Sequence, residues 1–144
     1  MRTALLVTAL TCSAAMAVQV RAATRQSVSG WARRGDYTLA GSLVREGTKT
    51  TGEFVLLIYP TTPGGASCRF TSFHDVRFDV GSVRFEGRGT CTSMPATGAP
   101  LTTDVDCRFV LEDGVKDRFD VEKVGTTGVS VPGGTIDSGD LKIR

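Results

Sequence analysis

The residues nearest to catalytic chemistry are a single histidine and its acidic neighbour. His74 and Asp75 form the only adjacent histidine–acid pair, because the chain contains one histidine. In a serine hydrolase a histidine takes the proton of a nucleophile and an acid orients the histidine. Ser72 is near in sequence, but no Gly-x-Ser-x-Gly motif accompanies it. We therefore interpret His74 as a turn residue, expect no catalytic residues, and predict that the protein is not an enzyme.

An acidic stretch in the C-terminal half is the second group that could do chemistry. Its members are Asp104, Asp106, Glu112, Asp113, Asp117, Asp120 and Glu122. Asp113 and Asp117 could offer two carboxylates to Ca²⁺, which prefers several oxygen ligands from a tight loop. The stretch lacks the twelve-residue EF-hand order, and Lys116 lies inside it. We favour a β-turn capped by Asp113 over this candidate calcium loop and predict no cofactor.

Arginines and aromatic residues on the predicted outer face form a third group. The arginines are Arg69, Arg77, Arg84, Arg88 and Arg108, and the aromatic residues are Trp31, Tyr37 and Tyr59. Stacking and bidentate contacts could bind a glycan or an anionic polymer there, with Trp31, Arg84 and Arg88 as the candidate residues. The favoured alternative is a solvated face with interspersed acids, and Trp31 would then close one end of the core.

The N-terminus has the composition of a secretory signal peptide. Met1-Arg2 precedes an apolar run over residues 3–18, which is shorter than a transmembrane helix. Small residues allow cleavage after Ala17 or Ala22, and we favour Ala22. Cys12 raises the alternative of a lipoprotein, but Ala9-Leu10-Thr11 is a poor lipobox. We predict a secreted or periplasmic protein with no transmembrane segment.

Removing residues 1–22 changes the charge and the cysteine count. The chain has 17 Lys and Arg against 15 Asp and Glu, and two of the arginines lie in the leader. The mature protein is then neutral, which gives no support for nucleic-acid binding. Three of four cysteines remain, namely Cys68, Cys91 and Cys107, and the lone histidine disfavours a zinc site. An oxidising compartment allows one disulfide bond.

Period-two alternation of apolar and polar residues predicts an all-β fold. It is found at residues 76–80, 83–88, 104–112, 118–122 and 140–144. Residues 54–59 are apolar on both faces and predict a central strand or a strand covered on both sides. Turn residues follow at 63–65, 95–100, 112–114 and 132–134. We predict a single antiparallel β-sandwich or short barrel of about eight strands over residues 31–144, after a loose segment at 23–30.

One hairpin can be given a register from the sequence. If the strands on either side of the 95–100 turn pair about residue 99, Cys91 lies opposite Cys107. The same register puts Gly89 opposite Phe109, where a glycine makes room for the ring. It also puts Glu86 opposite Glu112, which is unfavourable. We predict a Cys91–Cys107 disulfide, with Cys68 buried.

The order of several short motifs resembles a known family. After Trp31, the chain has Phe85-Glu86-Gly87-Arg88-Gly89, then Asp113-Gly114 with Asp117-Arg118-Phe119, and finally Gly133-Gly134 with Gly139-Asp140. This resembles the post-COAP type of β-sandwich module of secreted bacterial proteins. The resemblance implies an accessory, non-enzymatic role, and the three cysteines are not part of the pattern.

These observations favour a secreted, non-catalytic module that has a binding or structural role at the cell exterior. An extracellular protein or a glycan would be its partner. Two alternatives stay open: a small exported hydrolase, and a small-ligand carrier in a closed barrel. The sequence names no ligand and no oligomeric state.

Overall fold

The computed structural model describes residues 23–58 and 64–144, and these residues contain strands but no helix. The predicted leader and Tyr59 lie outside the described residues. None of the described residues belongs to a helix that could cross a membrane. The nine strands are β1 (Arg25–Arg34), β2 (Tyr37–Glu46), β3 (Lys49–Ile58), β4 (Ala66–Asp79), β5 (Ser82–Ser93), β6 (Leu101–Glu112), β7 (Arg118–Lys123), β8 (Val131–Thr135) and β9 (Ser138–Ile143).

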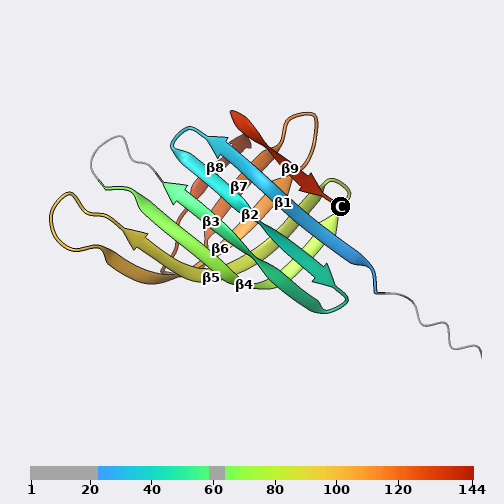
Figure 1. The fold of residues 1–144 in the computed structure, drawn as a ribbon, viewed down its shortest axis with the longest axis horizontal. Helices are drawn as coiled ribbons and strands as arrows, with labels where there is room; N and C mark the ends of the chain where they lie inside the picture. Colours follow the sequence, from blue (N-terminus) through green and yellow to red (C-terminus); the bar gives the residue numbers. More distant parts are fainter. Residues whose placement is uncertain (1–22, 59–63) are drawn as a thin grey trace, which may run out of the picture.

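The strands form one antiparallel sheet in the order β8-β7-β6-β5-β4-β3-β2-β1-β9. The sheet curls into a half-barrel, with β4 and β5 at its bend and β1–β3 passing across β6–β8 in Figure 1. Only Ile136 and Asp137 separate β8 from β9, although these strands are the two ends of the sheet. The all-β prediction is confirmed. One curled sheet of nine strands takes the place of the two packed sheets expected for a sandwich.

Three segments differ from the predictions in local structure. The segment 23–30 is not loose, because β1 begins at Arg25 and pairs with both β2 and β9. Backbone pairing orders this largely polar sequence, and its one large apolar residue, Val28, is fully buried in the core. Pro132-Gly133-Gly134 lies in β8 rather than in a turn, and an end strand tolerates proline because one edge needs no hydrogen bonds. Val80 is fully exposed in the β4–β5 turn.

The concave side of the half-barrel holds the core. Inward-facing residues alternate along each strand, and five phenylalanine rings fill the bend: Phe54, Phe70, Phe73, Phe85 and Phe109. Phe85 and Phe109 stack with ring centroids 4.9 Å apart. Each fully buried side chain of this size contributes about 1.5–3 kcal/mol. The strand containing Phe54 is central in the sheet, as predicted.

The β5–β6 hairpin pairs in a different register from the predicted one. Its centre lies at residue 97, so Glu86 faces Arg108 and Phe85 faces Phe109. The predicted centre at residue 99 is therefore wrong, and so is the opposition of Glu86 to Glu112. The observed register joins opposite charges on the outer face and aromatic rings on the inner face. Both gains favour it over the predicted one.

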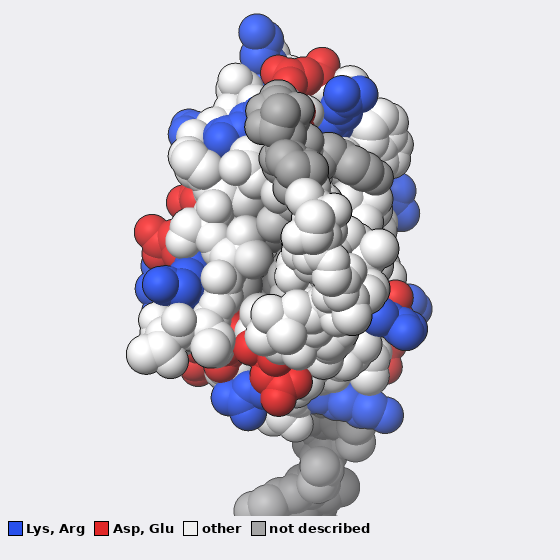
Figure 2. Space-filling view, turned by 90° about the vertical axis from the view of Figure 1, so that its left-hand side faces the viewer, with Lys and Arg blue, Asp and Glu red and all other residues white. Residues whose placement is uncertain are grey.

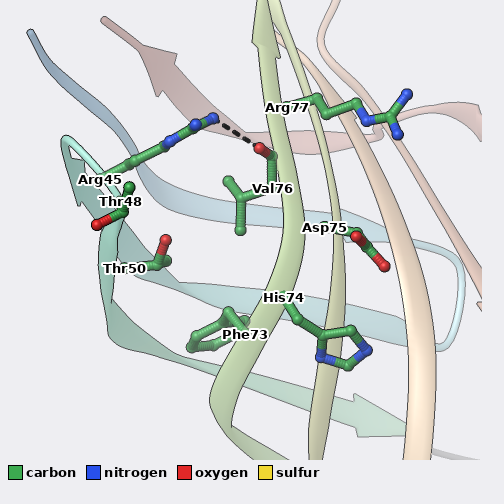
Figure 3. Close-up of a pocket in the computed structure, with 8 residues that line it drawn as sticks. All are labelled: Arg45, Thr48, Thr50, Phe73, His74, Asp75, Val76 and Arg77. Carbon is green, nitrogen blue, oxygen red and sulfur yellow. Dashed lines mark hydrogen bonds between the residues drawn. The ribbon is translucent and has the colours of Figure 1, made fainter.

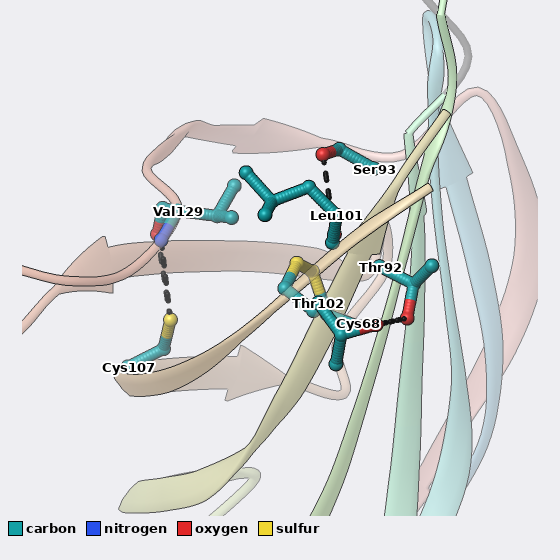
Figure 4. The surroundings of a disulfide bond; sticks show 8 residues. Cys68, Thr92, Ser93, Leu101, Thr102, Cys107 and Val129 are labelled. Carbon is teal, nitrogen blue, oxygen red and sulfur yellow. Dashed lines mark hydrogen bonds between the residues drawn. A yellow bond between two sulfur atoms is a disulfide. The ribbon is translucent and has the colours of Figure 1, made fainter. Parts of the chain in front are cut away.

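The predicted Cys91–Cys107 disulfide is also wrong. Cys91 is bonded to Cys68, its direct neighbour across β4 and β5. Cys107 lies opposite Gly87 and is a buried free thiol. Figure 4 shows it apart from the disulfide, in contact with the backbone of Val129, which donates to Sγ at 3.4 Å. Burial raises the pKa of this thiol.

Candidate functional site

Two irregularities in β4 shape the outer surface at the bend of the sheet. β3 pairs with β4 only along Phe54–Ile58, and the pairing of β4 with β5 shifts between Phe70 and Ser72 and again between His74 and Arg77. A β-bulge bends its strand, so the second half of β4 leaves β3. A concavity of about 560 Å³ lies where the strands part, lined in part by Thr48, Thr50 and His74. Arg45 spans it and donates to the carbonyl oxygen of Val76 at 2.7 Å (Figure 3).

The second bulge puts two consecutive side chains on the outer face. Successive residues of a regular strand point to opposite faces. Asp75, however, has φ of 50°, and its side chain projects to the same side as those of His74 and Arg77 (Figure 3). Val76 then packs against the core. Aspartate tolerates this left-handed conformation better than most residues, but it is uncommon outside glycine and worth a functional explanation.

His74 belongs to a polar network across three strands. Its Nε2 lies 3.1 Å from Oε2 of Glu86, the residue opposite it on β5. The other oxygen of Glu86 accepts a hydrogen bond at 2.7 Å from Nη2 of Arg108 on β6. This hydrogen bond lowers the pKa of the Glu86 carboxyl below its usual value, with burial acting in the opposite direction. His74 is therefore a strand residue in a network, and its assignment to a turn is wrong.

Arg77 and Arg84 lie directly opposite each other on β4 and β5. Like charges in this position destabilise a sheet. Other arginines of this face have carboxylate partners: Arg69 with Glu53 at 2.7 Å, Arg88 with Asp106 at 3.2 Å, and Arg108 with Glu86 at 2.7 Å. Within residues 23–58 and 64–144, no carboxylate lies within ion-pair distance of Arg77 or Arg84.

The two arginines line a second concavity of about 270 Å³ together with Asp75, Glu86 and Arg108. It shares Asp75 and Arg77 with the larger concavity next to it. Three arginines and two acidic residues therefore line one concavity on the outer surface. We call Arg77, Arg84 and Arg108 the arginine cluster.

The predicted surface-binding residues are not brought together. Arg84 belongs to the arginine cluster, whereas Arg88 is paired with Asp106. Trp31 lies on β1, four strands from β5 in the sheet order. Its side chain is 48% exposed, so the expectation that it closes the core is wrong. Figure 2 shows a face covered mostly by uncharged residues, with acidic and basic side chains next to one another around its margin.

The candidate calcium residues have a different role. Asp117 is buried, and its Oδ2 accepts a hydrogen bond from the backbone N–H of Leu141 at 2.6 Å, while Oδ1 accepts one from Gly114 at 3.2 Å. Asp113 accepts from the N–H of Ile143 at 3.0 Å. The two carboxylates thus take the place of a neighbouring strand along the free edge of β9. They join the segment between β6 and β7 to β9, and the candidate calcium loop, which the sequence disfavoured, stays a prediction.

Comparison with known proteins finds no matching family model, no matching curated protein and no matching solved structure. The resemblance to the post-COAP module therefore stays a prediction.

The sequence interpretation missed the partner of His74 and the opposition of two arginines. Both depend on which residues face each other across strands. Charge pairing could have indicated the correct register. The register that places Glu86 opposite Arg108 also avoids the unfavourable contact between Glu86 and Glu112. No comparable signal marks Asp75, since the bulge has no fixed sequence pattern.

Proposed function

We propose that the protein is an exported, non-catalytic β module that binds an anionic ligand at the arginine cluster. The observation that carries the proposal is the direct opposition of Arg77 and Arg84 without a carboxylate partner among the described residues. A bound anion would compensate the repulsion between the two guanidinium groups. The composition of residues 1–22 supports export, as does a disulfide between Cys68 and Cys91.

The chemistry of the cluster favours a ligand with carboxylate or sulfate groups. Guanidinium groups bind such oxyanions with paired, charge-assisted hydrogen bonds. The adjoining concavity offers the hydroxyl groups of Thr48 and Thr50 beside Arg45. An acidic glycan fits this combination, because it presents charged groups and hydroxyl groups along one chain.

Binding to an acidic polysaccharide tests the proposal. Polygalacturonate would be titrated into the mature protein by calorimetry, with neutral dextran as the comparison. Hydrogen bonds to charged groups contribute about 1.5–3 kcal/mol each. The Arg77→Ala/Arg84→Ala variant should therefore bind at least about tenfold more weakly, since 1.4 kcal/mol corresponds to a factor of ten.

A matched control removes the same charge elsewhere. Arg25 and Arg118 lie on β1 and β7 and form long surface ion pairs of 3.6 Å. The Arg25→Ala/Arg118→Ala variant should bind about as well as the unaltered protein. Equal losses in both double variants would show non-specific attraction between charges and would overturn the proposal.

A second candidate, a small exported hydrolase, is favoured by the convergence of Asp75 and Glu86 on His74. The side chain of His74 is 40% exposed, however, and its hydrogen-bond partner is Glu86 rather than a nucleophile. Hydrolysis of 4-nitrophenyl acetate or phosphate that is lost in His74→Ala would favour the hydrolase. Absence of turnover supports the binding module.

A further inference from the structure

Three potential ligand atoms converge on the outer face beside the arginine cluster. They belong to His74, Asp75 and Glu86 and all lie within 4.8 Å of one another. The sole histidine of the chain is one of them. We propose that these three residues form a binding site for a divalent transition-metal ion of the Zn²⁺ or Co²⁺ type.

The bulge in β4 is the structural reason for the convergence. A regular strand would put His74 and Asp75 on opposite faces. The left-handed conformation of Asp75 instead places its carboxylate beside His74, on the face where Glu86 lies opposite. Bulges often redirect a side chain at functional sites, and a strained residue persists only where its surroundings maintain it. The bulge therefore serves two roles, because it turns Val76 toward the core and brings the Asp75 carboxylate beside His74.

The distances agree with coordination. Ligand atoms that lie about 2 Å from the same zinc ion are about 3–4 Å from each other. Nε2 of His74 and Oε2 of Glu86 are 3.1 Å apart, which fits this range. Asp75 is exposed, and its carboxylate lies within 4.8 Å of the other two ligand atoms.

Glu86 is also held as metal ligands usually are. Carboxylate ligands commonly accept a hydrogen bond from a neighbouring residue, which fixes the oxygen that faces the metal. Arg108 donates to Oε1 of Glu86 at 2.7 Å and leaves Oε2 directed at His74.

The ligand types favour a first-row transition metal over Ca²⁺ and Mg²⁺. One imidazole nitrogen and two carboxylates suit Zn²⁺ and Co²⁺, whereas Ca²⁺ requires six to eight oxygens and Mg²⁺ retains most of its water. Three protein ligands leave at least one coordination position for water or an anion. Asp75 and Glu86 line the same concavity as Arg77 and Arg84. An oxyanion bound there could therefore contact both the metal ion and the guanidinium groups.

This arrangement predicts coupling between the metal and the anion, a part of the inference that rests on the proposed function. The positive charge of the arginine cluster weakens binding of a bare cation, and a bound anion removes that repulsion. The anion and the metal should therefore tighten each other's binding, by the same factor in both directions. Sulfate is a suitable probe, because its zinc and cobalt salts are soluble.

The test uses the mature protein without a histidine tag. Zn²⁺ binding would be measured by calorimetry, and Co²⁺ binding by visible absorption. The single histidine gives one set of imidazole NMR signals, so a shift on addition of Zn²⁺ reports directly on His74. We expect one ion per chain and a shift of these signals.

Variants separate the site from other surface carboxylates. Loss of a residue that merely supports a ligand costs about 10- to 100-fold in metal affinity. His74→Ala and Asp75→Asn should weaken Zn²⁺ binding at least as much. Asp104→Asn is the matched control, because Asp104 is an exposed carboxylate of β6 that lies opposite Thr90. It should leave the affinity unchanged.

The outcomes distinguish the two proposals. No Zn²⁺ or Co²⁺ binding at millimolar concentration, or binding that His74→Ala leaves intact, overturns the metal site. Polygalacturonate binding in the presence of EDTA would still support the anion-binding function in that case. Metal binding without any binding of sulfate or polygalacturonate would support the metal site and refute the proposed function.

Discussion

One buried carboxylate joins the segment between β6 and β7 to the free edge of β9. Asp117 is 8% exposed and accepts hydrogen bonds from Leu141 at 2.6 Å and from Gly114 at 3.2 Å. β9 is paired with β1 on its other edge, so the N–H of Leu141 has no neighbouring strand to bind on this side. Asp117→Ala should therefore destabilise the protein and open the edge of β9.

The magnitude follows from these two contacts. A buried N–H left without a partner costs about 1–3 kcal/mol, and the partly buried contact to Gly114 adds about 0.5–1.5 kcal/mol. We expect a total loss of about 1.5–4.5 kcal/mol in the free energy of unfolding. That is a large share of the roughly 5–15 kcal/mol of a natural domain. Asp117→Asn keeps one accepting oxygen and should lose about half as much.

Urea unfolding and hydrogen exchange measure this effect. The midpoint should fall in Asp117→Ala, and the amide of Leu141 should exchange faster than the amides of β5. Asp140→Ala is the control, because Asp140 lies on β9 beside Leu141 and forms an exposed ion pair with Lys142. It should change stability by less than about 1 kcal/mol. If Asp117→Ala and Asp140→Ala lower the urea midpoint equally, the Asp117 carboxylate does not stabilise the edge of β9, and our reasoning is refuted.

Three other perturbations test the packing, the disulfide and the surface network. Reduction of the Cys68–Cys91 bond, which links residues 23 positions apart, should lower the free energy of unfolding in urea by about 3 kcal/mol. Gly87→Ala should cost about 1–3 kcal/mol in thermal unfolding, because a Cβ there would lie 3.0 Å from the ring of Phe109. The lowered pKa of Glu86 means that its stabilising effect is present above the pKa of the unfolded chain and is lost as pH falls through the folded pKa. Glu86→Gln should accordingly show a shallower fall of Tm on acidification.

Each of these has its own control. A protein with alanine at both bonded cysteine positions should no longer respond to reductant. Gly114→Ala should be nearly neutral, because the nearest atom to its added Cβ is 3.6 Å away. Glu122→Gln removes an exposed carboxylate 3.7 Å from Arg108 and should keep the acid dependence of the unaltered protein. A steep acid dependence that survives in Glu86→Gln would contradict the assignment to Glu86.

Much of the fold could be predicted from the residues alone. Alternation at 104–112 and 118–122 identified β6 and β7, and the apolar run at 54–59 identified a central strand. These patterns depend only on the pleat of a strand, which puts every second side chain on the same face. The inward position of Cys107 follows from the same parity, and the structure confirms that it is buried.

Pairing between strands could not be predicted in the same way. A register centred at residue 97 and one centred at residue 99 give every residue of the β5–β6 hairpin the same face. Only contacts across the sheet separate them, through the stacking of Phe85 on Phe109 and the attraction of Glu86 to Arg108. The wrong register led to the wrong disulfide, because Cys91 was compared with Cys107 and not with its neighbour on β4.

The sequence by itself determined the all-β class and which residues of most strands share a face. It also singled out His74 as the one histidine that could take part in chemistry. The tertiary structure decided what surrounds that histidine. A bulge turns Asp75 to the outer face, β5 supplies Glu86, and the curl of the sheet gives Asp117 a strand edge to bind. The physical reason is that alternation is local to one strand, whereas bulges, registers and sheet closure are set by the sum of contacts between strands far apart in the chain.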